Sequence, residues 1–563
     1  MISRKFVQRA NFLVLVFFSL IGITLWRLVS VQVVAAPLYR DFVLSRLSLN
    51  EIPAPRGQIL DRNGEVLAKD VEVLSVFACP VLIDDPQKVA QKLAQTLSLD
   101  EQDLSEKLSQ GTTWLVIKKR VPLHLEEQLL RERLPGIYWV REQMRFYPKA
   151  PLLSNLLGFV GDEHQGLEGL EFVFDRYLQG EKGYASFEKD ALGEEIPLST
   201  QYFPPREGCT LILTLDVNIQ FFVEKALDGV MERTQAKRGV IIVNNPQTGD
   251  ILAMASRPSF DNRYFSTYDP SSWRNLALEM VFEPGSTVKP LVMAGALQEK
   301  VVRLDDQFFC SGGIVVHKHR VRDIKAHGQE RLEDLIINSC NVGMIEVAQK
   351  LGVDRLYRYL RDFGLAEESG WGFPGEEIGL LRKPKDWSLL SLGAIPIGQE
   401  MMVTPLQVLR SLSALANKGR VMQPRLVQAI VGSNGKVVEE FPVTPLKQVV
   451  SEKVAALVLE MMEKVVSKGT GKRAGISGYR IAGKTGTGQK VDESGRYALG
   501  KFYSSFVGFF PLPEPLFGIF IMLDEPQGEY YGGDIAAPVF REIAMNIVRY
   551  AGIISGDAEV KVF

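Results

Sequence analysis

The chain has 563 residues, of which 46% are hydrophobic and 23% are charged, and its formal net charge is −2. This length exceeds that of one typical domain, which is about 50–250 residues. The near-zero net charge gives no sign of a nucleic-acid-binding surface. The composition is neither that of a disordered chain nor that of a collagen.

The N-terminal segment predicts a membrane anchor. Three basic residues among the first nine precede an apolar run over 10–26. A membrane-crossing helix needs about 20 apolar residues, and its basic flank stays in the cytoplasm. A cleaved signal peptide is the alternative, favoured by Ala35-Ala36 and disfavoured by the nearby Arg27. We expect a cytoplasmic tail over 1–9, an uncleaved anchor over 10–30, and the rest of the chain on the extracytoplasmic side of the membrane.

Residues 31–205 predict an elongated α+β module. Short strand-like runs, such as 71–78 and 113–117, alternate with polar turns, and 86–97 reads as a short helix with a proline at its start. The simplest role of such a module is that of a pedestal between the membrane and a second domain. A turn rich in proline and glycine at 203–208 marks its end.

Residues 206–553 predict a second domain built on an antiparallel sheet, followed by a tail over 554–563. Asp216 is suited to cap a helix, and the turn at 246–249 to close a hairpin. The helices between the strands would flank the sheet and form an all-helical lobe. The expected strands cover 210–215, 239–244, 249–254, 479–487 and 517–523.

Ser286 and Lys289 form an S-x-x-K motif. This spacing places both side chains on one face of a helix, about 5–6 Å apart at Cβ. In a buried apolar site the ammonium is disfavoured, so neutral Lys289 can take the proton of Ser286. Pro290 is tolerated only if it lies in the first turn of the helix. A serine and a lysine on a solvated helix surface are the alternative.

Ser339 and Asn341 form an S-x-N motif at a break between two apolar helical segments. The Ser339 hydroxyl could pass a proton to a leaving amine, and the Asn341 amide could hold Lys289 and a substrate carbonyl. The alternative is that these residues merely cap a helix, because serine and asparagine are favoured N-caps.

Lys484-Thr485-Gly486-Thr487 follows a β-branched and aromatic run, which predicts a strand. A lysine with flanking hydroxyls suits a substrate carboxylate, and Gly486 would let a substrate backbone lie close to the strand. The alternative is an ordinary edge strand protected by a lysine.

The ordered set S-x-x-K, S-x-N and K-T-G is the signature of penicillin-binding proteins and serine β-lactamases. With the strings Phe282–Pro290, Ser505–Pro511 and Tyr530–Phe540, the chain resembles the class B penicillin-binding proteins, the monofunctional peptidoglycan transpeptidases. Arg56–Gly64 and Gly166–Glu171 resemble the non-catalytic module of that family. The fold implied is α/β multidomain: a transmembrane helix, a pedestal with a dimerisation-like role, and a serine β-lactamase-like transpeptidase domain.

The resemblance implies a role for each motif residue. Ser286 would attack the penultimate D-Ala carbonyl of a D-Ala-D-Ala stem peptide, with Lys289 as the general base. Ser339 and Asn341 would assist proton transfer, while Lys484, Thr485, Gly486 and Thr487 would bind the substrate. The backbone N–H groups of Ser286 and Thr487 would form the oxyanion hole. β-Lactams would acylate Ser286, and no cofactor is required.

The resemblance also implies a setting for the enzyme. The Lys484–Lys490 stretch and the Tyr530-Tyr531 segment look most like the division-specific, septal type, which cross-links the wall during division. The implied partners are a SEDS-family glycosyltransferase and other divisome membrane proteins. One departure is Glu400, where many relatives carry a glycine. Alternatives left open are an elongation-type transpeptidase, a β-lactam hydrolase or sensor, a carboxypeptidase, and a catalytically idle division scaffold.

The cysteines and histidines give no further site at this stage. None of Cys79, Cys209, Cys310 and Cys340 forms a C-x-x-C pair, and the sequence cannot pair them in disulfides. His317 and His319 form a lone H-x-H motif without acidic neighbours. We therefore expect no metal site.

Overall fold

The computed structural model describes residues 4–34, 47–189, 195–491 and 496–554. Most of the expected C-terminal tail (554–563) and the first three residues of the expected cytoplasmic tail lie outside the described residues. The chain divides into two compact units. One unit comprises 1–55 and 180–207, and the other comprises 56–179 and 208–563. The division at residue 205 that the sequence suggests stays a prediction.

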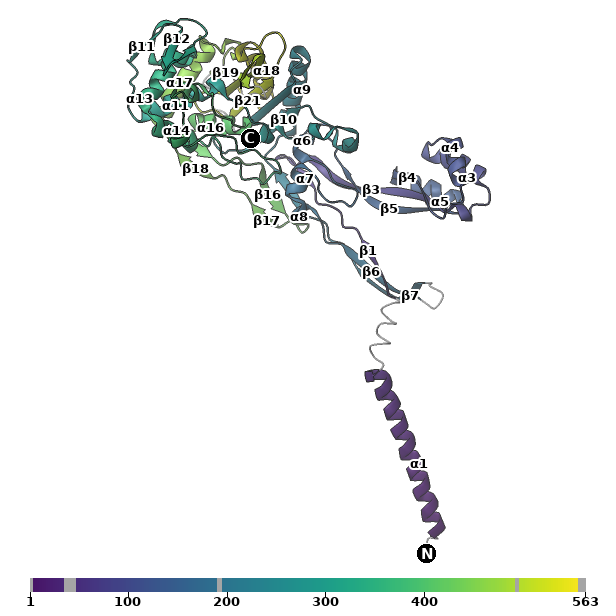
Figure 1. Cartoon of the computed structure of the whole chain (residues 1–563). Coiled ribbons are helices and arrows are strands. Elements are labelled where there is room, and N and C mark those ends of the chain that lie inside the picture. Colours follow the sequence, from purple (N-terminus) through teal and green to yellow (C-terminus); the bar gives the residue numbers. More distant parts are fainter. Residues whose placement is uncertain (1–3, 35–46, 190–194, 492–495, 555–563) are drawn as a thin grey trace. The chain divides into compact units, whose positions relative to one another are not determined.

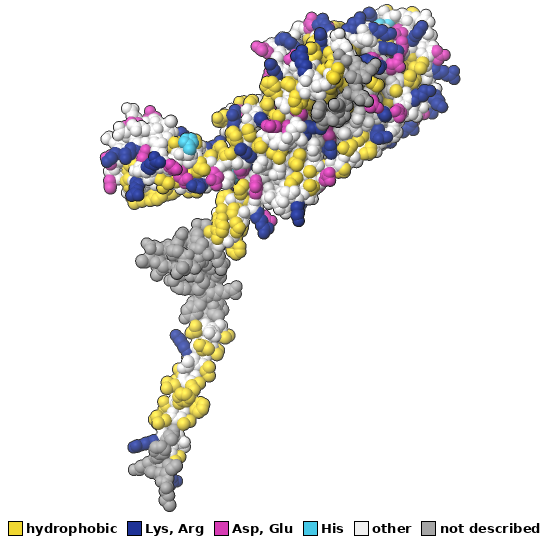
Figure 2. Space-filling model, turned by 180° about the vertical axis from the view of Figure 1, so that it is seen from behind, with side chains coloured by type: hydrophobic (Ala, Val, Ile, Leu, Met, Phe, Trp, Pro, Cys, Tyr) yellow, Lys and Arg dark blue, Asp and Glu magenta, His cyan; other side chains and the backbone are white. Residues whose placement is uncertain are grey.

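The first unit contains a long apolar helix and a three-stranded antiparallel sheet ordered β1-β6-β7. Helix α1 is fully exposed along its apolar length, as the hydrophobic surface of this segment in Figure 2 shows. The span Val7–Val33 is the one candidate membrane-crossing helix among the described residues, with a mean hydropathy of 2.3. The elements are α1 (Arg4–Val29), the π-helical turn η1 (Ser30–Val34), β1 (Leu47–Ile52), β6 (Gly183–Lys189) and β7 (Glu195–Phe203).

The second unit begins with a mixed sheet ordered β17-β16-β8-β2-β3-β4, in which β5 also pairs with β3. The short strand β2 lies parallel to β8, whose residues come some 150 positions later. The strands are β2 (Ile59–Leu60), β3 (Val66–Ala78), β4 (Leu115–Pro122), β5 (Ile137–Phe146), β8 (Thr210–Leu213), β16 (Val427–Val431) and β17 (Val437–Glu440).

Strand β3 belongs to two hydrophobic cores. Its first half contributes Leu67 and Ala68 to the main core of the unit. Its second half contributes Leu74 and Val76 to a separate core formed with three helices. The short helices of this part are α3 (Pro86–Leu97), α4 (Glu101–Leu108), α5 (Glu126–Glu132), α6 (Ser154–Leu157), α7 (Gly169–Val173) and α8 (Asp175–Leu178). The expected helix over 86–97 is confirmed.

Two segments that resemble the family's non-catalytic module meet in a buried ion cluster. Arg56 Nε lies 2.6 Å from Glu171 Oε2, and both side chains are essentially inaccessible to solvent. Arg145 Nε donates to the other Glu171 oxygen over 2.7 Å, and Arg145 Nη1 lies 3.1 Å from Asp70. Removing one partner of such a buried ion cluster strongly destabilises the fold, because it leaves a buried charge uncompensated.

A five-stranded antiparallel sheet, ordered β10-β9-β21-β20-β19, forms the centre of the remaining chain. Its strands are buried on both faces. Val240 and Ile242 of β9 face the main core, whereas Ile241 and Val243 face a second core. Successive side chains of a strand point to opposite faces, so a sheet covered on both sides reads as a continuous apolar run. The strands are β9 (Arg238–Asn244), β10 (Ile251–Arg257), β19 (Ala482–Val491), β20 (Tyr497–Phe510) and β21 (Phe517–Asp524).

Helices cover both faces of this sheet, as Figure 1 shows. Two long helices lie on one face: α9 (Val217–Thr234), capped by Asp216 as expected, and α18 (Gly532–Tyr550). The helical lobe packs on the other face and carries two of the motifs. Its helices are α10 (Leu276–Glu279), α11 (Lys289–Gln298), α12 (Leu332–Ile337), α13 (Asn341–Leu351), α14 (Val353–Asp362), α15 (Ser391–Ala394), α16 (Pro405–Ala416) and α17 (Glu452–Ser467).

Short two-stranded ribbons and single 3₁₀ turns complete the unit. The ribbons pair β11 (Gln307–Cys310) with β14 (Gly328–Arg331), β12 (Gly313–Val316) with β13 (His319–Arg322), and β15 (Arg420–Met422) with β18 (Pro445–Gln448). The expected α/β multidomain fold is confirmed, including the hairpin of β9 and β10. The strand expected over 479–487 begins at Ala482 rather than Tyr479, because Tyr479 lies in a turn closed by a hydrogen bond to Ile476.

Candidate active site

Ser286 lies in a 3₁₀ turn, η6 (Gly285–Val288), that leads directly into α11. Lys289 is the first residue of that helix, and Pro290 occupies its first turn, where its missing N–H costs nothing. The Ser286 side chain is half-buried, whereas Lys289 is completely buried. The alternative of a solvated helix surface is therefore wrong.

The Lys289 ammonium is held by the S-x-N segment. Its Nζ donates to the Ser339 carbonyl oxygen over 2.6 Å and to Asn341 Oδ1 over 2.7 Å, and it lies 3.4 Å from Ser339 Oγ. Burial lowers the pKa of Lys289 to about 8, although the neighbouring Asp323, Cys340 and Glu330 oppose this shift. A lysine with this pKa is partly neutral near pH 7 and can accept a proton.

The S-x-N motif forms the sharp turn between α12 and α13. Ser339 has a φ of +59°, a left-handed conformation that few residues other than glycine adopt. Cys340 is the N-cap of α13, and its sulfur accepts a hydrogen bond from Gly343 N–H at 3.4 Å. The interpretation of Ser339 or Asn341 as the cap is therefore wrong, since the turn instead directs both groups toward Lys289.

The K-T-G motif lies on β19, the edge strand of the five-stranded sheet. Lys484 is fully buried, and its Nζ donates to Ser339 Oγ over 2.9 Å and to the Thr485 carbonyl over 3.0 Å. Burial, with a smaller contribution from the charge of Lys289, holds the pKa of Lys484 well below its usual value. A lysine that protected an exposed edge would be solvated, so that alternative is wrong.

Close backbone packing joins the strand to the serine turn. A Cβ on Gly486 would lie 2.3 Å from Ser505 Oγ and 2.7 Å from Thr287 Cγ2. Gly285 has a φ of +56°, and a Cβ there would lie 3.0 Å from the Thr487 carbonyl oxygen. Only glycine fits at these two contacts, so Thr487 lies directly beside the turn that carries Ser286.

The two threonines of the motif are held by neighbouring segments. Thr485 Oγ1 is 2.8 Å from Thr470 Oγ1, and Thr487 Oγ1 accepts a hydrogen bond from Gly532 N–H over 3.3 Å. Their hydroxyls are thereby fixed along β19.

The structure adds acidic residues that sequence reasoning missed. Asp323 Oδ2 accepts hydrogen bonds from the N–H groups of Asn341 and Val342, at the start of α13. Glu283 is buried three residues before Ser286, and burial raises its pKa. One of its oxygens accepts a hydrogen bond from Glu400 N–H over 2.9 Å. These contacts join segments far apart in the chain, so no local spacing could reveal them.

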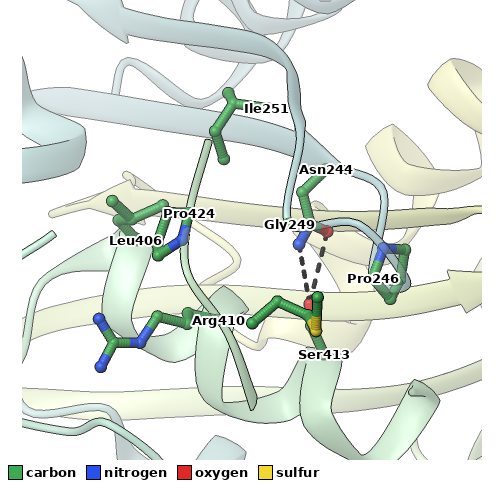
Figure 3. A pocket seen from close by; sticks show the side chains of 9 residues that line it. Asn244, Pro246, Gly249, Ile251, Leu406, Arg410, Ser413 and Pro424 are labelled. Atoms are coloured by element: carbon green, nitrogen blue, oxygen red, sulfur yellow. Dashed lines mark hydrogen bonds between the residues drawn. The ribbon is translucent and has the colours of Figure 1, made fainter. Parts of the chain in front are cut away.

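A small cavity elsewhere in the unit is distinct from this site. It has a volume of about 10 Å³, which is room for one water molecule at most. Figure 3 shows that Asn244 and Ser413 close it with mutual hydrogen bonds, of which the one donated by Asn244 Nδ2 measures 3.0 Å. None of its lining residues belongs to the three motifs, so it carries no argument for catalysis.

Two family models match this chain. The penicillin-binding protein transpeptidase domain matches residues 239–545, and the penicillin-binding protein dimerisation domain matches residues 51–213. Together the two matches account for most of the chain between residues 51 and 545.

Curated proteins and solved structures of similar length also match. Stage V sporulation protein D of Bacillus subtilis is 34% identical over 88% of this chain and 78% of its own length. Peptidoglycan D,D-transpeptidase FtsI of Escherichia coli K12 is 30% identical over 98% of this chain and 92% of its own length. The crystal structure of penicillin-binding protein 3 from Mycobacterium tuberculosis, complexed with aztreonam, is 28% identical. It has a TM-score of 0.71 and covers 90% of this chain and 98% of that chain.

Proposed function

Because this chain belongs to the class B penicillin-binding proteins, which are peptidoglycan D,D-transpeptidases, we propose that Ser286 is the nucleophile with which it cross-links stem peptides. The observation that carries this assignment is the buried hydrogen-bond network in which Lys289 and Lys484 both contact Ser339. Three motifs from distant parts of the chain thereby form one site.

In the proposed reaction, Lys289, Ser286 and Ser339 act in turn. Neutral Lys289 takes the proton of Ser286, whose oxygen attacks the penultimate D-Ala carbonyl. The N–H groups of Ser286 and Thr487 stabilise the oxyanion, a contribution of roughly 2.7–4 kcal/mol per donor in other acyl-transfer enzymes. Ser339, held between the two lysines, passes its proton to the departing D-Ala nitrogen and takes the proton of Ser286 from Lys289, which becomes neutral again.

The acyl-enzyme is then consumed by an amine. The side-chain amine of a neighbouring stem peptide attacks the ester carbonyl, the bond to Ser286 Oγ breaks, and a proton of the attacking amine passes through Lys289 to the serine oxygen. Lys484 and the hydroxyls of Thr485 and Thr487 hold the carboxylate of the donor peptide, and Gly486 leaves room for its backbone. A β-lactam acylates Ser286 in the same way, but no amine follows it.

Labelling with a fluorescent penicillin tests the nucleophile. We expect the full-length protein in detergent to be labelled stably and in a one-to-one ratio, and Ser286→Ala to remain unlabelled. Ser271→Ala is a matched control because Ser271 is exposed and outside the motifs. Labelling that persists in Ser286→Ala would mean that another residue is acylated.

The kinetics of the same reaction distinguish a transpeptidase from a hydrolase. A transpeptidase consumes one equivalent of β-lactam, which stays bound to Ser286 as the opened acyl-enzyme, and the reaction then stops because water is not positioned for attack. A β-lactam hydrolase would turn over steadily. Glu400 is the candidate for the deacylating base that a hydrolase would need. Its backbone N–H binds Glu283, but its Oε2 atom is buried without a hydrogen-bond partner.

We further propose that this enzyme acts at the division septum, anchored by α1 with the catalytic unit outside the membrane. The length and hydropathy of α1 and its basic flank support the anchor. The Lys484–Lys490 stretch and the Tyr530-Tyr531 segment support the septal role and, with it, a SEDS-family glycosyltransferase and other divisome proteins as partners.

Complementation tests this role. Expression in cells depleted of their own septal transpeptidase is expected to restore division, and Ser286→Ala at equal abundance is expected not to. Rescue of cell shape in cells depleted of their elongation enzyme, without rescue of division, would assign the elongation role instead. Rescue of division by Ser286→Ala would identify a scaffold.

A further inference from the structure

A group of metal-ligating side chains lies buried beside the S-x-N turn. Cys310 ends β11, Glu330 lies on the neighbouring strand β14, and Cys340 is the N-cap of α13. One ligand atom from each residue lies within 4.8 Å of the other two. It is the one such group among the described residues, and its members come from three segments that sequence spacing could not connect.

Two buried polar atoms at this group have no hydrogen-bond partner. Glu330 is 3% exposed, and while its Oε1 accepts from Asn338 Nδ2 over 2.9 Å, its Oε2 has no partner. His327 Nε2 is also unpartnered, and this ring lies between Asp323 (3.7 Å) and Glu330 (3.8 Å). Buried polar atoms are nearly always satisfied, so an unpartnered carboxylate oxygen beside two sulfur atoms calls for an additional positive group.

We propose that Cys310, Cys340 and Glu330 bind a zinc ion. Thiolates with a carboxylate suit Zn²⁺, whereas Mg²⁺ and Ca²⁺ select oxygen ligands alone. In a tetrahedral site with Zn–S near 2.3 Å and Zn–O near 2.0–2.2 Å, the ligand atoms stand about 3–4 Å apart. The observed limit of 4.8 Å requires only small side-chain adjustments to reach this geometry.

The charge of the buried group permits the exchange of two thiol protons for one zinc ion. Burial, together with the neighbouring Glu330 and Asp323, raises the pKa of the Cys340 thiol. One Zn²⁺ enters as two thiol protons leave, so the net charge of the buried group is unchanged. Because this net charge does not change, the electrostatic effect of the group on the neighbouring Lys289 also stays about the same.

The consequence of this site is positional. A metal bound there ties the β11–β14 ribbon to the turn in which Cys340 stands between Ser339 and Asn341, the two residues that hold Lys289. His327 would orient the Glu330 carboxylate from behind, as partners of ligating groups do in metal sites. Zinc would thus fix the catalytic turn without contacting the substrate.

Metal binding to the full-length protein tests the proposal. The protein is first reduced with a phosphine, because a disulfide between Cys310 and Cys340 would occupy the same sulfur atoms. It is then stripped of bound metal with a chelator. We expect one Zn²⁺ per chain with release of two protons, and with Co²⁺ a thiolate-to-metal charge-transfer band. Cys310→Ser and Glu330→Gln are expected to weaken zinc binding by at least about tenfold.

The double variant Cys79→Ser with Cys209→Ser is the matched control, since both cysteines are free and outside the group. It is expected to bind zinc as the wild type does. Stoichiometric zinc with unchanged affinity in Cys310→Ser would overturn the proposal. If that variant fails to fold, the wild type decides: a folded, reduced protein without the cobalt–thiolate band refutes the site, and its presence supports it.

Discussion

The pH dependence of acylation follows from the burial of Lys289. With a pKa of about 8, the neutral fraction of this amine is about 1% at pH 6, about 9% at pH 7 and about 50% at pH 8. Only the neutral form can accept the Ser286 proton. The acylation rate should therefore rise roughly 50-fold from pH 6 to pH 8 and less than twofold from pH 8 to pH 9. An exposed lysine, with its usual pKa, would still gain about tenfold over that last interval.

The assay is stopped-flow acylation of the full-length protein by a chromogenic cephalosporin, at fixed ionic strength. Lys289→Arg keeps the positive charge but cannot become neutral, so it is expected to lower the rate by roughly 10²–10⁴-fold and to remove the pH dependence. Lys225→Arg, at an exposed position of α9, is the control. A profile that is flat from pH 6 to pH 8, or an unchanged rate in Lys289→Arg, would refute the assignment of Lys289 as the base.

Three further variants test the packing around the site and below it. Gly486→Ala should lower stability by about 1–3 kcal/mol and abolish acylation, because its Cβ overlaps Ser505 Oγ; normal melting and labelling would contradict the close packing. Glu400→Gly should raise stability by about 1 kcal/mol in thermal unfolding, because it relieves a φ of +60°; a lower melting temperature would show that the Glu400 side chain contributes more than this strain costs. Glu171→Gln should destabilise by about 3–5 kcal/mol in denaturant unfolding, because it leaves two buried guanidinium groups short of charge; a change below 1 kcal/mol would argue against the buried cluster.

Local signals in the sequence predicted much of the fold and the motif residues. Pro86 at the start of α3 and Asp216 before α9 are helix starts that need no distant partner, and both are confirmed. The alternation of faces along β9 was hidden, because both faces are covered and the four central residues, Val240 to Val243, are all apolar. The order of the three motifs predicted that Lys289 and Lys484 lie in one site. Their hydrogen bonds to Ser339 confirm that the two lysines lie close together.

The parts that could not be predicted depend on long-range contacts. Cys340 caps α13 in the place expected of a serine or asparagine, because the left-handed turn at Ser339 shifts the start of the helix by one residue. The approach of Cys310 and Glu330 to Cys340 is set by a ribbon of eight residues whose pairing no periodicity reveals. Lys289 and Lys484 are likewise buried by distant segments, so the local sequence around each lysine does not show that it is buried.

The parallel pairing of β2 with β8 has a consequence for the order in which this protein is made. Strand β2 has one neighbour, β3, as soon as the chain has grown past residue 78, but its other edge stays open until residue 213 is available. Synthesis at about 5–20 residues per second makes this interval roughly 7–27 s. Strand β8 then waits in turn for β16, more than 200 residues later. The sheet in the N-terminal half of the chain therefore has an unpaired strand edge during much of synthesis. An unpaired edge can pair with other chains, so we expect a chaperone to bind the growing chain at this stage.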